Sequence, residues 1–221
     1  QEGAKLADEL KDSAAGNFYR QESERIARKL KSEFTDERVG ILVTSQKSAA
    51  LGYKNSGLDV APLLALLHTS PYQKLFSLND SYILKYVDVL TNTFAEIYDV
   101  NKKYSDLGVG IGRYPEDRYD GYTTTKLGNP WFLSTIALGE YYCLLKDELN
   151  KTGKLTSLLS KNLTDMTEKQ FKRVLFHSDR IGHLSEQFNH VTGTMQGAVD
   201  LTWSHNSFMT AMMRCHLVGK K

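Results

Sequence analysis

The sequence has few cysteines and almost no net charge. Two cysteines among 221 residues, Cys143 and Cys215, cannot form the framework of a disulfide-stapled fold. Both lie in apolar, helix-like surroundings, so we expect buried thiols. Because 28 basic residues nearly balance 26 acidic ones, the net charge of +2 gives no reason to expect a nucleic acid or a membrane surface as partner.

Long apolar runs are also missing. No run approaches the roughly 20 residues that cross a bilayer. The first residues, Gln1 to Lys5, lack the charged-then-apolar pattern of a signal peptide. We therefore expect an N-terminus that is mature, processed or truncated.

Alternating strand patterns are nearly absent, the exception being the short run 39–43. Helical periodicity dominates the rest, and 41% of the residues are hydrophobic, enough for one domain over 1–221 with a real core. Seven helices are predicted, near 3–12, 20–34, 57–69, 79–98, 129–148, 165–182 and 200–217.

Three of these helices have start signals. Asn129 precedes Pro130, Asp165 precedes Glu168 by three residues, and Asp200 precedes an apolar turn, so each of the three can act as an N-cap.

Short connections favour antiparallel neighbours, so alternate helices should start at one end of the molecule. That end then receives the long, irregular loops 40–56, 99–128 and 183–199, and long loops gathered on one rim usually carry function. The helix starts near 57, 129 and 200 are about 70 residues apart, as two helical hairpins would require. This pattern predicts an all-α fold of the alpha-alpha toroid type.

Charged and aromatic residues alternate in segment 110–119, where Arg113 and Asp117 offer paired donors and acceptors for sugar hydroxyls. Tyr119 and Trp131 offer flat faces for a pyranose ring. An Arg113–Asp117 salt bridge beside a Trp131 packed in the core explains the same residues. The residues by themselves leave both interpretations open.

Glu186 lies between Ser185 and Gln187, whose hydrogen bonds could hold its carboxylate as a general base that positions water. A solvated loop glutamate is the simpler interpretation. The only tryptophans, Trp131 and Trp203, fall in the first turns of predicted helices that start at the same rim, which favours a sugar-binding depression.

These segments, in this order, resemble the signatures of fungal and yeast glucoamylases. They are 56–59 with 68–69, 112–117 with 128–133, 184–188 and 200–204. The resemblance covers the chain from about residue 50 onward and corresponds to the C-terminal half of the family's catalytic domain.

The resemblance implies an (α/α)6 toroid that releases β-glucose from the non-reducing ends of starch, glycogen and malto-oligosaccharides. It also implies hydrolysis of α-1,4 links, and more slowly of α-1,6 links, with inversion at the anomeric carbon. Glu186 matches the general base. Arg113 and Asp117 match sugar contacts, Trp131 an aromatic wall and Tyr119 a subsite tyrosine, although the spacer from Tyr119 to Gly128 is longer than in the filamentous-fungal versions. Trp203 follows the same motif and is expected to support the substrate site.

The family's general acid comes from a Trp-x-Glu-Glu motif, which this sequence lacks. The start of the chain resembles the helix that follows the acid-bearing loop. We therefore expect the acid upstream of Gln1, an incomplete barrel with unburied apolar surface, and the missing N-terminal half as a partner. The alternative is a non-catalytic glycan-binding or regulatory module on the same toroid. A helical scaffold for protein partners would leave the segment from Arg113 to Trp131 unexplained.

His183, Glu186 and His190 are spaced closely enough to suggest a metal, but ligation from one face would need a continuous helix. We expect hydrogen bonding, with no metal and no cofactor. Sequons at Asn79, Asn150 and Asn162, near predicted helix ends or loops, favour a secreted or vacuolar glycoprotein.

Overall fold

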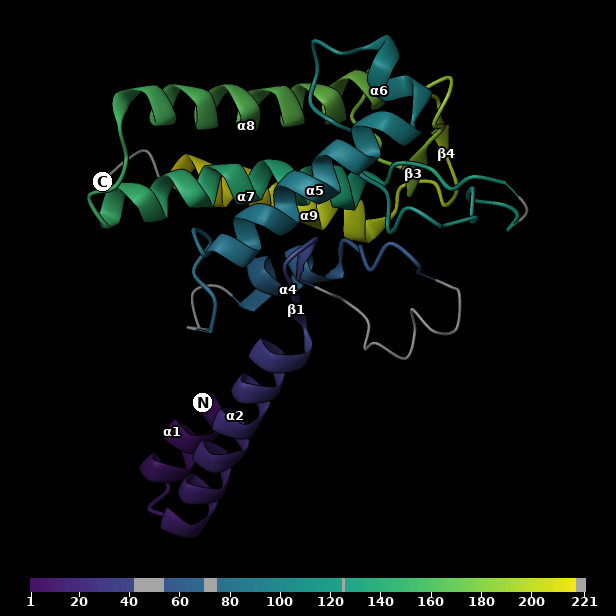
Figure 1. Ribbon diagram of the computed structural model, residues 1–221. Helices are drawn as coiled ribbons and strands as arrows, with labels where there is room; N and C mark the ends of the chain where they lie inside the picture. The colour runs from purple at the N-terminus through teal and green to yellow at the C-terminus, as the bar shows by residue number, and fades with distance from the viewer. Residues whose placement is uncertain (42–53, 70–74, 125, 218–221) are drawn as a thin grey trace.

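The computed structural model describes residues 1–41, 54–69, 75–124 and 126–217. Helices dominate, as the periodicity predicts, so the all-α prediction is confirmed (Figure 1). The elements in chain order are α1 (Glu2–Glu9), α2 (Ser13–Glu33), β1 (Thr35–Asp36), β2 (Gly40–Ile41), α4 (Ala61–Thr69), α5 (Ser81–Ile97), α6 (Asp99–Lys103), α7 (Phe132–Lys151), α8 (Ser157–His177), β3 (Gln187–Phe188), β4 (Met195–Gln196) and α9 (Thr202–Leu217).

The three predicted N-caps are wrong, although α7 and α9 begin close to their predicted starts. Helix α2 begins at Ser13 and not near 20, and α8 begins well before residue 165. Helix α8 begins at Ser157, where the Thr156 hydroxyl accepts a hydrogen bond from Leu159 N at 3.2 Å, so Asp165 lies inside the helix. Helix α7 begins at Phe132, and the Asn129 side chain bonds to other loops. Asp200 has a φ of 50°, and its carboxylate contacts His183 and His205.

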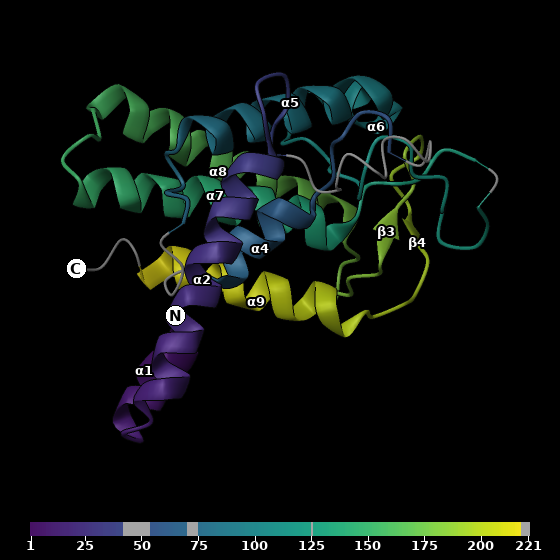
Figure 2. The ribbon, with the colours of Figure 1, turned by 60° about the horizontal axis from the view of Figure 1, so that its bottom comes forward.

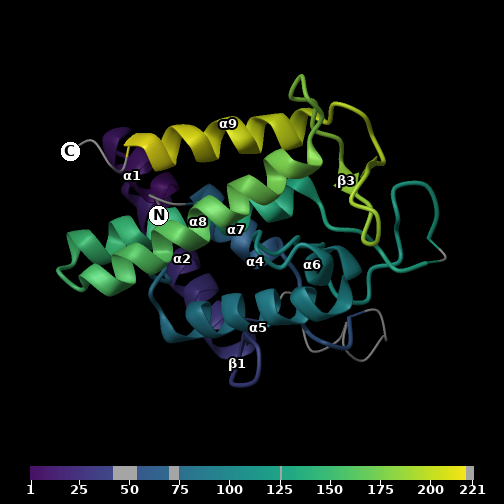
Figure 3. The ribbon, with the colours of Figure 1, turned by 90° about the horizontal axis from the view of Figure 1, so that it is seen from above.

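Helices α4, α7, α8 and α9 form a layer, with α7 at its centre. Helix α7 is buried on nearly all sides, because its sequence lacks a polar face, and an apolar helix of this kind must be covered by neighbours. Helices α8 and α9 run beside it, and α4 packs against it (Figures 1 and 3). On the outside of the layer, Asp80 caps α5 by accepting from Tyr82 N at 2.9 Å.

The two ends of this layer differ. Helices α7 and α9 start at one end and α8 finishes there, as antiparallel packing predicts (Figure 3). This loop end carries residues 104–124, 126–131 and 178–201, including the antiparallel β3–β4 hairpin. The opposite turn end consists of residues 152–156 and 75–80. Most of the third loop expected at the rim, 40–56, lies outside the described residues.

The α1–α2 hairpin projects from the layer (Figures 1 and 2). Several of its apolar side chains are exposed, among them Leu10 at 71% and Phe18 at 58%. Asp12 caps α2 by accepting from Ala15 N at 2.9 Å. Large apolar side chains are also exposed on α8 and α9, among them Phe176 and Met213, so exposed apolar surface is not confined to this hairpin.

The prediction of two free buried thiols is wrong. Cys143 on α7 and Cys215 on α9 form a disulfide, with their Cα atoms 5.8 Å apart. The two cysteines are 72 positions apart, and the sequence does not show this pairing because it depends on α9 packing along α7.

Candidate active site at the loop end

The Arg113 and Asp117 side chains form a forked ion pair. Arg113 Nε donates to Asp117 Oδ2 and Nη2 donates to Oδ1, each at 2.7 Å. The carboxylate is 2% exposed while the guanidinium is 37% exposed. The hydrogen bond to Asp117 raises the pKa of Arg113, so this side chain stays charged. The expected salt bridge therefore exists, and it leaves part of the arginine facing outward.

Aromatic rings surround that guanidinium. Its central carbon lies 5.2 Å from the Trp131 ring, 5.6 Å from the Tyr119 ring and 5.5 Å from the Tyr114 ring, all within cation–π range. Trp131 is 7% exposed, and Nε1 of its indole has no acceptor among the described residues. Trp131 is thus packed against the core and also contacts the arginine loop. Its position is compatible with both interpretations given above, core packing and a wall of a sugar site.

Glu186 precedes the β3–β4 hairpin and is held by its backbone. Its N–H donates to Ala198 O at 2.8 Å, and its carbonyl accepts from Phe132 N, the first residue of α7, at 3.3 Å. The Tyr119 hydroxyl lies 3.3 Å from Glu186 Oε2 and 3.1 Å from the Gly121 carbonyl oxygen, so these two acceptors share its single proton. Partial desolvation, followed by the Glu186 charge, raises the pKa of Tyr119, so the phenol remains a donor at neutral pH.

Gly197 gives this carboxylate its space. With φ at 78°, it adopts a conformation that favours glycine, and a Cβ there would lie 2.5 Å from Glu186 Oε2. The sequence analysis assigns Gly197 no role, because only the hairpin brings it against Glu186.

A buried histidine supports the hairpin from behind. The His177 ring stacks on Phe188, with centroids 4.2 Å apart, and its Nδ1 donates to Gly193 O at 2.8 Å. Burial, and then the charge of Arg173, lower the pKa of His177 to about 4. The ring is therefore neutral at physiological pH and serves as a fixed packing surface.

The segment before α4, residues 54–60, packs against the loop that carries Arg113. Val60 N donates to Arg113 O at 2.7 Å, and the Ser56 hydroxyl donates to Glu116 at 3.0 Å. Lys54 pairs with Asp59 and lies 4.3 Å from the Tyr114 ring. The sequence analysis notes residues 56–59 as part of a motif, but it does not foresee their contact with the arginine loop.

Five of the six predicted site residues come together: Arg113, Asp117, Tyr119, Trp131 and Glu186. Trp203 differs. It is 47% exposed in the first turn of α9, and its neighbour Ser204 donates to Ser185 O at 2.9 Å. The α9 start thus contacts the residue before Glu186 through Ser204, and a supporting role for Trp203 stays a prediction.

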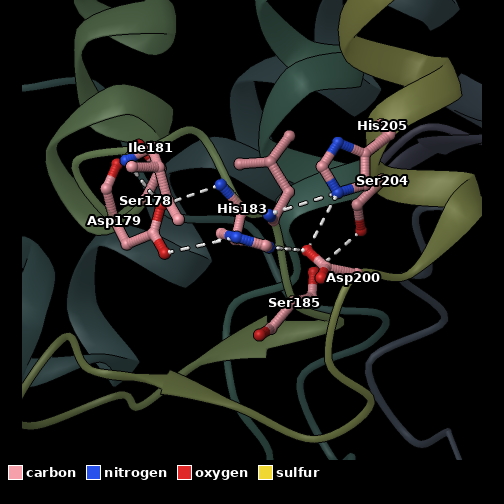
Figure 4. Close-up of polar contacts among 9 residues, drawn as sticks. Ser178, Asp179, Ile181, His183, Ser185, Asp200, Ser204 and His205 are labelled. Atoms are coloured by element: carbon pink, nitrogen blue, oxygen red, sulfur yellow. Dashed lines mark hydrogen bonds and ion pairs between the residues drawn. The ribbon is translucent and has the colours of Figure 1, made fainter.

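The histidines near Glu186 bind other groups. His183 lies between Asp179 and Asp200, and His205 approaches Asp200 from α9 (Figure 4). The Asp200 carboxylate raises the pKa of His183. His190 contacts Asn129. Within the described ranges, no group of three or more potential ligands could hold a metal ion.

A groove with a volume of about 690 Å³ lies away from the loop end, between α1, α2 and α4. Its walls are mostly apolar, with Tyr19, Ile26 and Leu30 among them. Such walls suit helix packing better than a ligand rich in hydroxyl groups. The carboxylates, arginine and aromatic rings place the candidate chemistry at the loop end.

A helical layer with aromatic rings, a forked arginine and a held carboxylate at its loop rim is typical of glycoside hydrolases built on helical toroids. The chain belongs to glycosyl hydrolase family 15, whose family model matches residues 1–213.

Relatives are named glucoamylases. Glucoamylase 1 of Rhizopus oryzae is 31% identical over 95% of this chain and 39% of that protein. The glucoamylase of Blastobotrys adeninivorans is 29% identical over 95% of this chain and also 39% of its own length. The chain thus spans about two fifths of these relatives.

Solved structures agree on the fold. A glucoamylase from Saccharomycopsis fibuligera superimposes with a TM-score of 0.85 and 23% identity over 99% of this chain and 53% of that one. The Hormoconis resinae glucoamylase gives a TM-score of 0.77 and 26% identity, over 97% of this chain and 40% of that one. The expected (α/α)6 toroid class is confirmed.

Proposed function

We propose that this chain supplies the general base and part of the sugar-binding surface of a glucoamylase-type hydrolase. The whole protein would release β-glucose from the non-reducing ends of starch or glycogen, cleaving α-1,4 and α-1,6 links with inversion. The observation that carries the proposal is the Glu186 carboxylate, fixed by the backbone and by Tyr119 beside the Arg113–Asp117 fork.

In the proposed reaction Glu186 takes a proton from a water molecule as that water attacks the anomeric carbon. Tyr119 occupies Oε2, whereas Oε1 receives no hydrogen bond from the described residues and is the oxygen we assign to the water. Arg113 binds sugar hydroxyls through Nη1 and the second N–H of Nη2, because Asp117 holds the Nε–H and one N–H of Nη2. Trp131 borders the sugar that leaves.

An inverting reaction needs a second carboxyl group, roughly 6.5–9.5 Å from the base, to protonate the departing oxygen. We propose that this acid lies in the part of the family domain outside this chain, since the sequence lacks the Trp-x-Glu-Glu motif. That part would also be the partner that covers the exposed apolar side chains of α1 and α2.

Glucose release from maltoheptaose tests this proposal, for the chain alone and for the chain preceded by the rest of a family 15 domain. We expect activity in the extended form, with β-glucose as the first anomer seen by NMR. Glu186→Gln should lower kcat by roughly 10³-fold.

Glu148→Gln is the matched control. This carboxylate accepts from Leu78 N at 3.2 Å at the turn end, away from the site, so its loss should leave kcat unchanged. Binding of malto-oligosaccharides with no hydrolysis in either form would instead favour the glycan-binding module and exclude Glu186 as a base.

We also propose a secreted or vacuolar location, supported by the disulfide, which persists in oxidising compartments. Asn150 and Asn162 are exposed, although Asn162 lies within α8 and not in the loop expected before it. One relative is named an intracellular, sporulation-specific glucoamylase. No helix in the described residues is long and apolar enough to cross a membrane. An unchanged mobility after endoglycosidase treatment of the natural protein would argue against glycosylation.

A further inference from the structure

The Asn129 carboxamide is fully buried, with 0% exposure, where the Tyr119 loop meets the β3–β4 hairpin. Its Nδ2 donates to Asp120 O at 2.9 Å and to Gln187 Oε1 at 3.0 Å. Its Oδ1 accepts from His190 N at 3.0 Å and from His190 Nδ1 at 2.8 Å. Both donors and both acceptor sites of the amide are therefore in use.

This pattern fixes the orientation of the amide. The Asp120 carbonyl can only accept and the His190 backbone N–H can only donate, so the nitrogen must face Asp120 and the oxygen must face His190. Burial lowers the pKa of His190, and the neutral ring then carries its proton on Nδ1. No other side chain of this size offers two donors and two acceptors.

Two partners of Asn129 are chain neighbours of the site. Asp120 follows Tyr119, and Gln187 follows Glu186. Gln196 Nε2 also donates to Asp120 O, at 2.5 Å, which ties the tyrosine loop to the β3–β4 hairpin a second time.

The backbone beside Asn129 continues this connection. Phe188 N donates to Pro130 O at 3.0 Å, and Trp131 forms an isolated bridge with Gln187. Asn129 thus connects the residue after Tyr119 with the residue after Glu186, beneath the contact between those two side chains. Losing its bonds would free both partners of that contact at once.

We propose that Asn129 is a positioning residue that holds Glu186 and Tyr119 together for hydrolysis. The proposal rests on the function proposed above. A carboxylate at this position cannot donate to Asp120 O or Gln187 Oε1, so a shape-conserving change disrupts the contact. Near-attack geometry is sensitive to shifts of about 1 Å, so the expected loss in kcat is on the order of 10²-fold.

The test compares Asn129→Asp with Glu148→Ala in the full natural polypeptide that contains this sequence. Glu148 also bridges a turn, through Ser77, Leu78 and Asn79, but at the turn end. Both variants are assayed on maltoheptaose well below their Tm. We expect the kcat loss for Asn129→Asp alone, with KM changed less than about tenfold and the acid limb of the kcat profile moved to higher pH. An equal loss in kcat for both variants overturns the proposal.

A second measurement needs no turnover. The Tyr119 phenol is titrated by NMR of ¹³Cζ-labelled tyrosine and assigned with Tyr119→Phe. Asn129→Ser, which replaces the carboxamide with a smaller hydroxyl and adds no charge, is the milder change if Asn129→Asp fails to fold. It should bring the raised pKa of Tyr119 back toward its ordinary value. An unchanged Tyr119 titration overturns the proposal. An inactive wild type refutes only the proposed function, because the titration still decides the role of Asn129.

Discussion

At the loop end of the helical layer the buried side chains are polar and connect one loop to another, whereas the turn end is closed by short turns. Asp117, Asn129, His177 and Gln187 are buried at the loop end. At the turn end, α7 and α8 are joined by five residues, and Glu148 binds the turn before α5. Irregular backbone leaves N–H and C=O groups without helical partners, so long loops need buried amides and carboxylates.

This difference separates two kinds of substitution. At the loop end, the groups that satisfy the backbone also hold Glu186 and Arg113, so changes there should alter activity. At the turn end and along α7, changes should alter stability alone. Three experiments can break or sharpen that separation.

Removing the disulfide has the largest expected effect. The double change Cys143→Ser with Cys215→Ser opens a loop closed across 72 residues. We expect the free energy of unfolding to fall by about 4 kcal/mol on the chain-entropy model, measured by urea denaturation. Because the bridge joins α7 to α9 away from Glu186, kcat at low temperature should stay within about twofold of wild type. A large drop in kcat would show that the helices and the site are not independent.

Acidification should weaken the loop end next. The folded pKa of His177, about 4, lies below the ordinary histidine value of about 6.5, so between these pH values the native state binds fewer protons than the unfolded chain. The stabilisation is complete above pH 6.5 and is lost as the pH falls toward 4, amounting to about 3 kcal/mol.

Chemical denaturation of wild type and His177→Gln between pH 7.5 and 4 measures this loss of unfolding free energy. The glutamine variant should be less stable at neutral pH and should lose less stability on acidification. Parallel curves for the two proteins would contradict the assignment.

The smallest effect comes from a matched pair of phenols. Tyr119→Phe removes the donor to Glu186 Oε2, and Tyr141→Phe removes the donor to Leu78 O, which lies 2.9 Å away near the turn end. We expect Tyr119→Phe to lower kcat/KM about fivefold with little change in Tm, and Tyr141→Phe to cost about 1 kcal/mol of stability with kcat/KM unchanged. Equal activity in both variants would show that the Tyr119 hydroxyl has no role in the site.

Much of the fold could be predicted from the sequence, because helical periodicity is local. Helix α5 was expected near 79–98 and is found at Ser81–Ile97. The start of α8 was misplaced at Asp165, because a local capping signal does not show how far a helix packs along its neighbour, here α7. The β3–β4 hairpin was missed because its strands have two residues each.

The sequence by itself determined the helical class, the candidate residues from Arg113 to Glu186 and the expectation that they share one rim, because antiparallel helices bring alternate loops to the same end. The tertiary structure decided which distant groups meet: Cys143 with Cys215, Tyr119 with Glu186, and Asn129 with Gln187 and His190. It also left Trp203 half exposed. These outcomes depend on the packing of α9 and the loops around α7, and contacts between residues far apart in the chain have no local signature in the sequence.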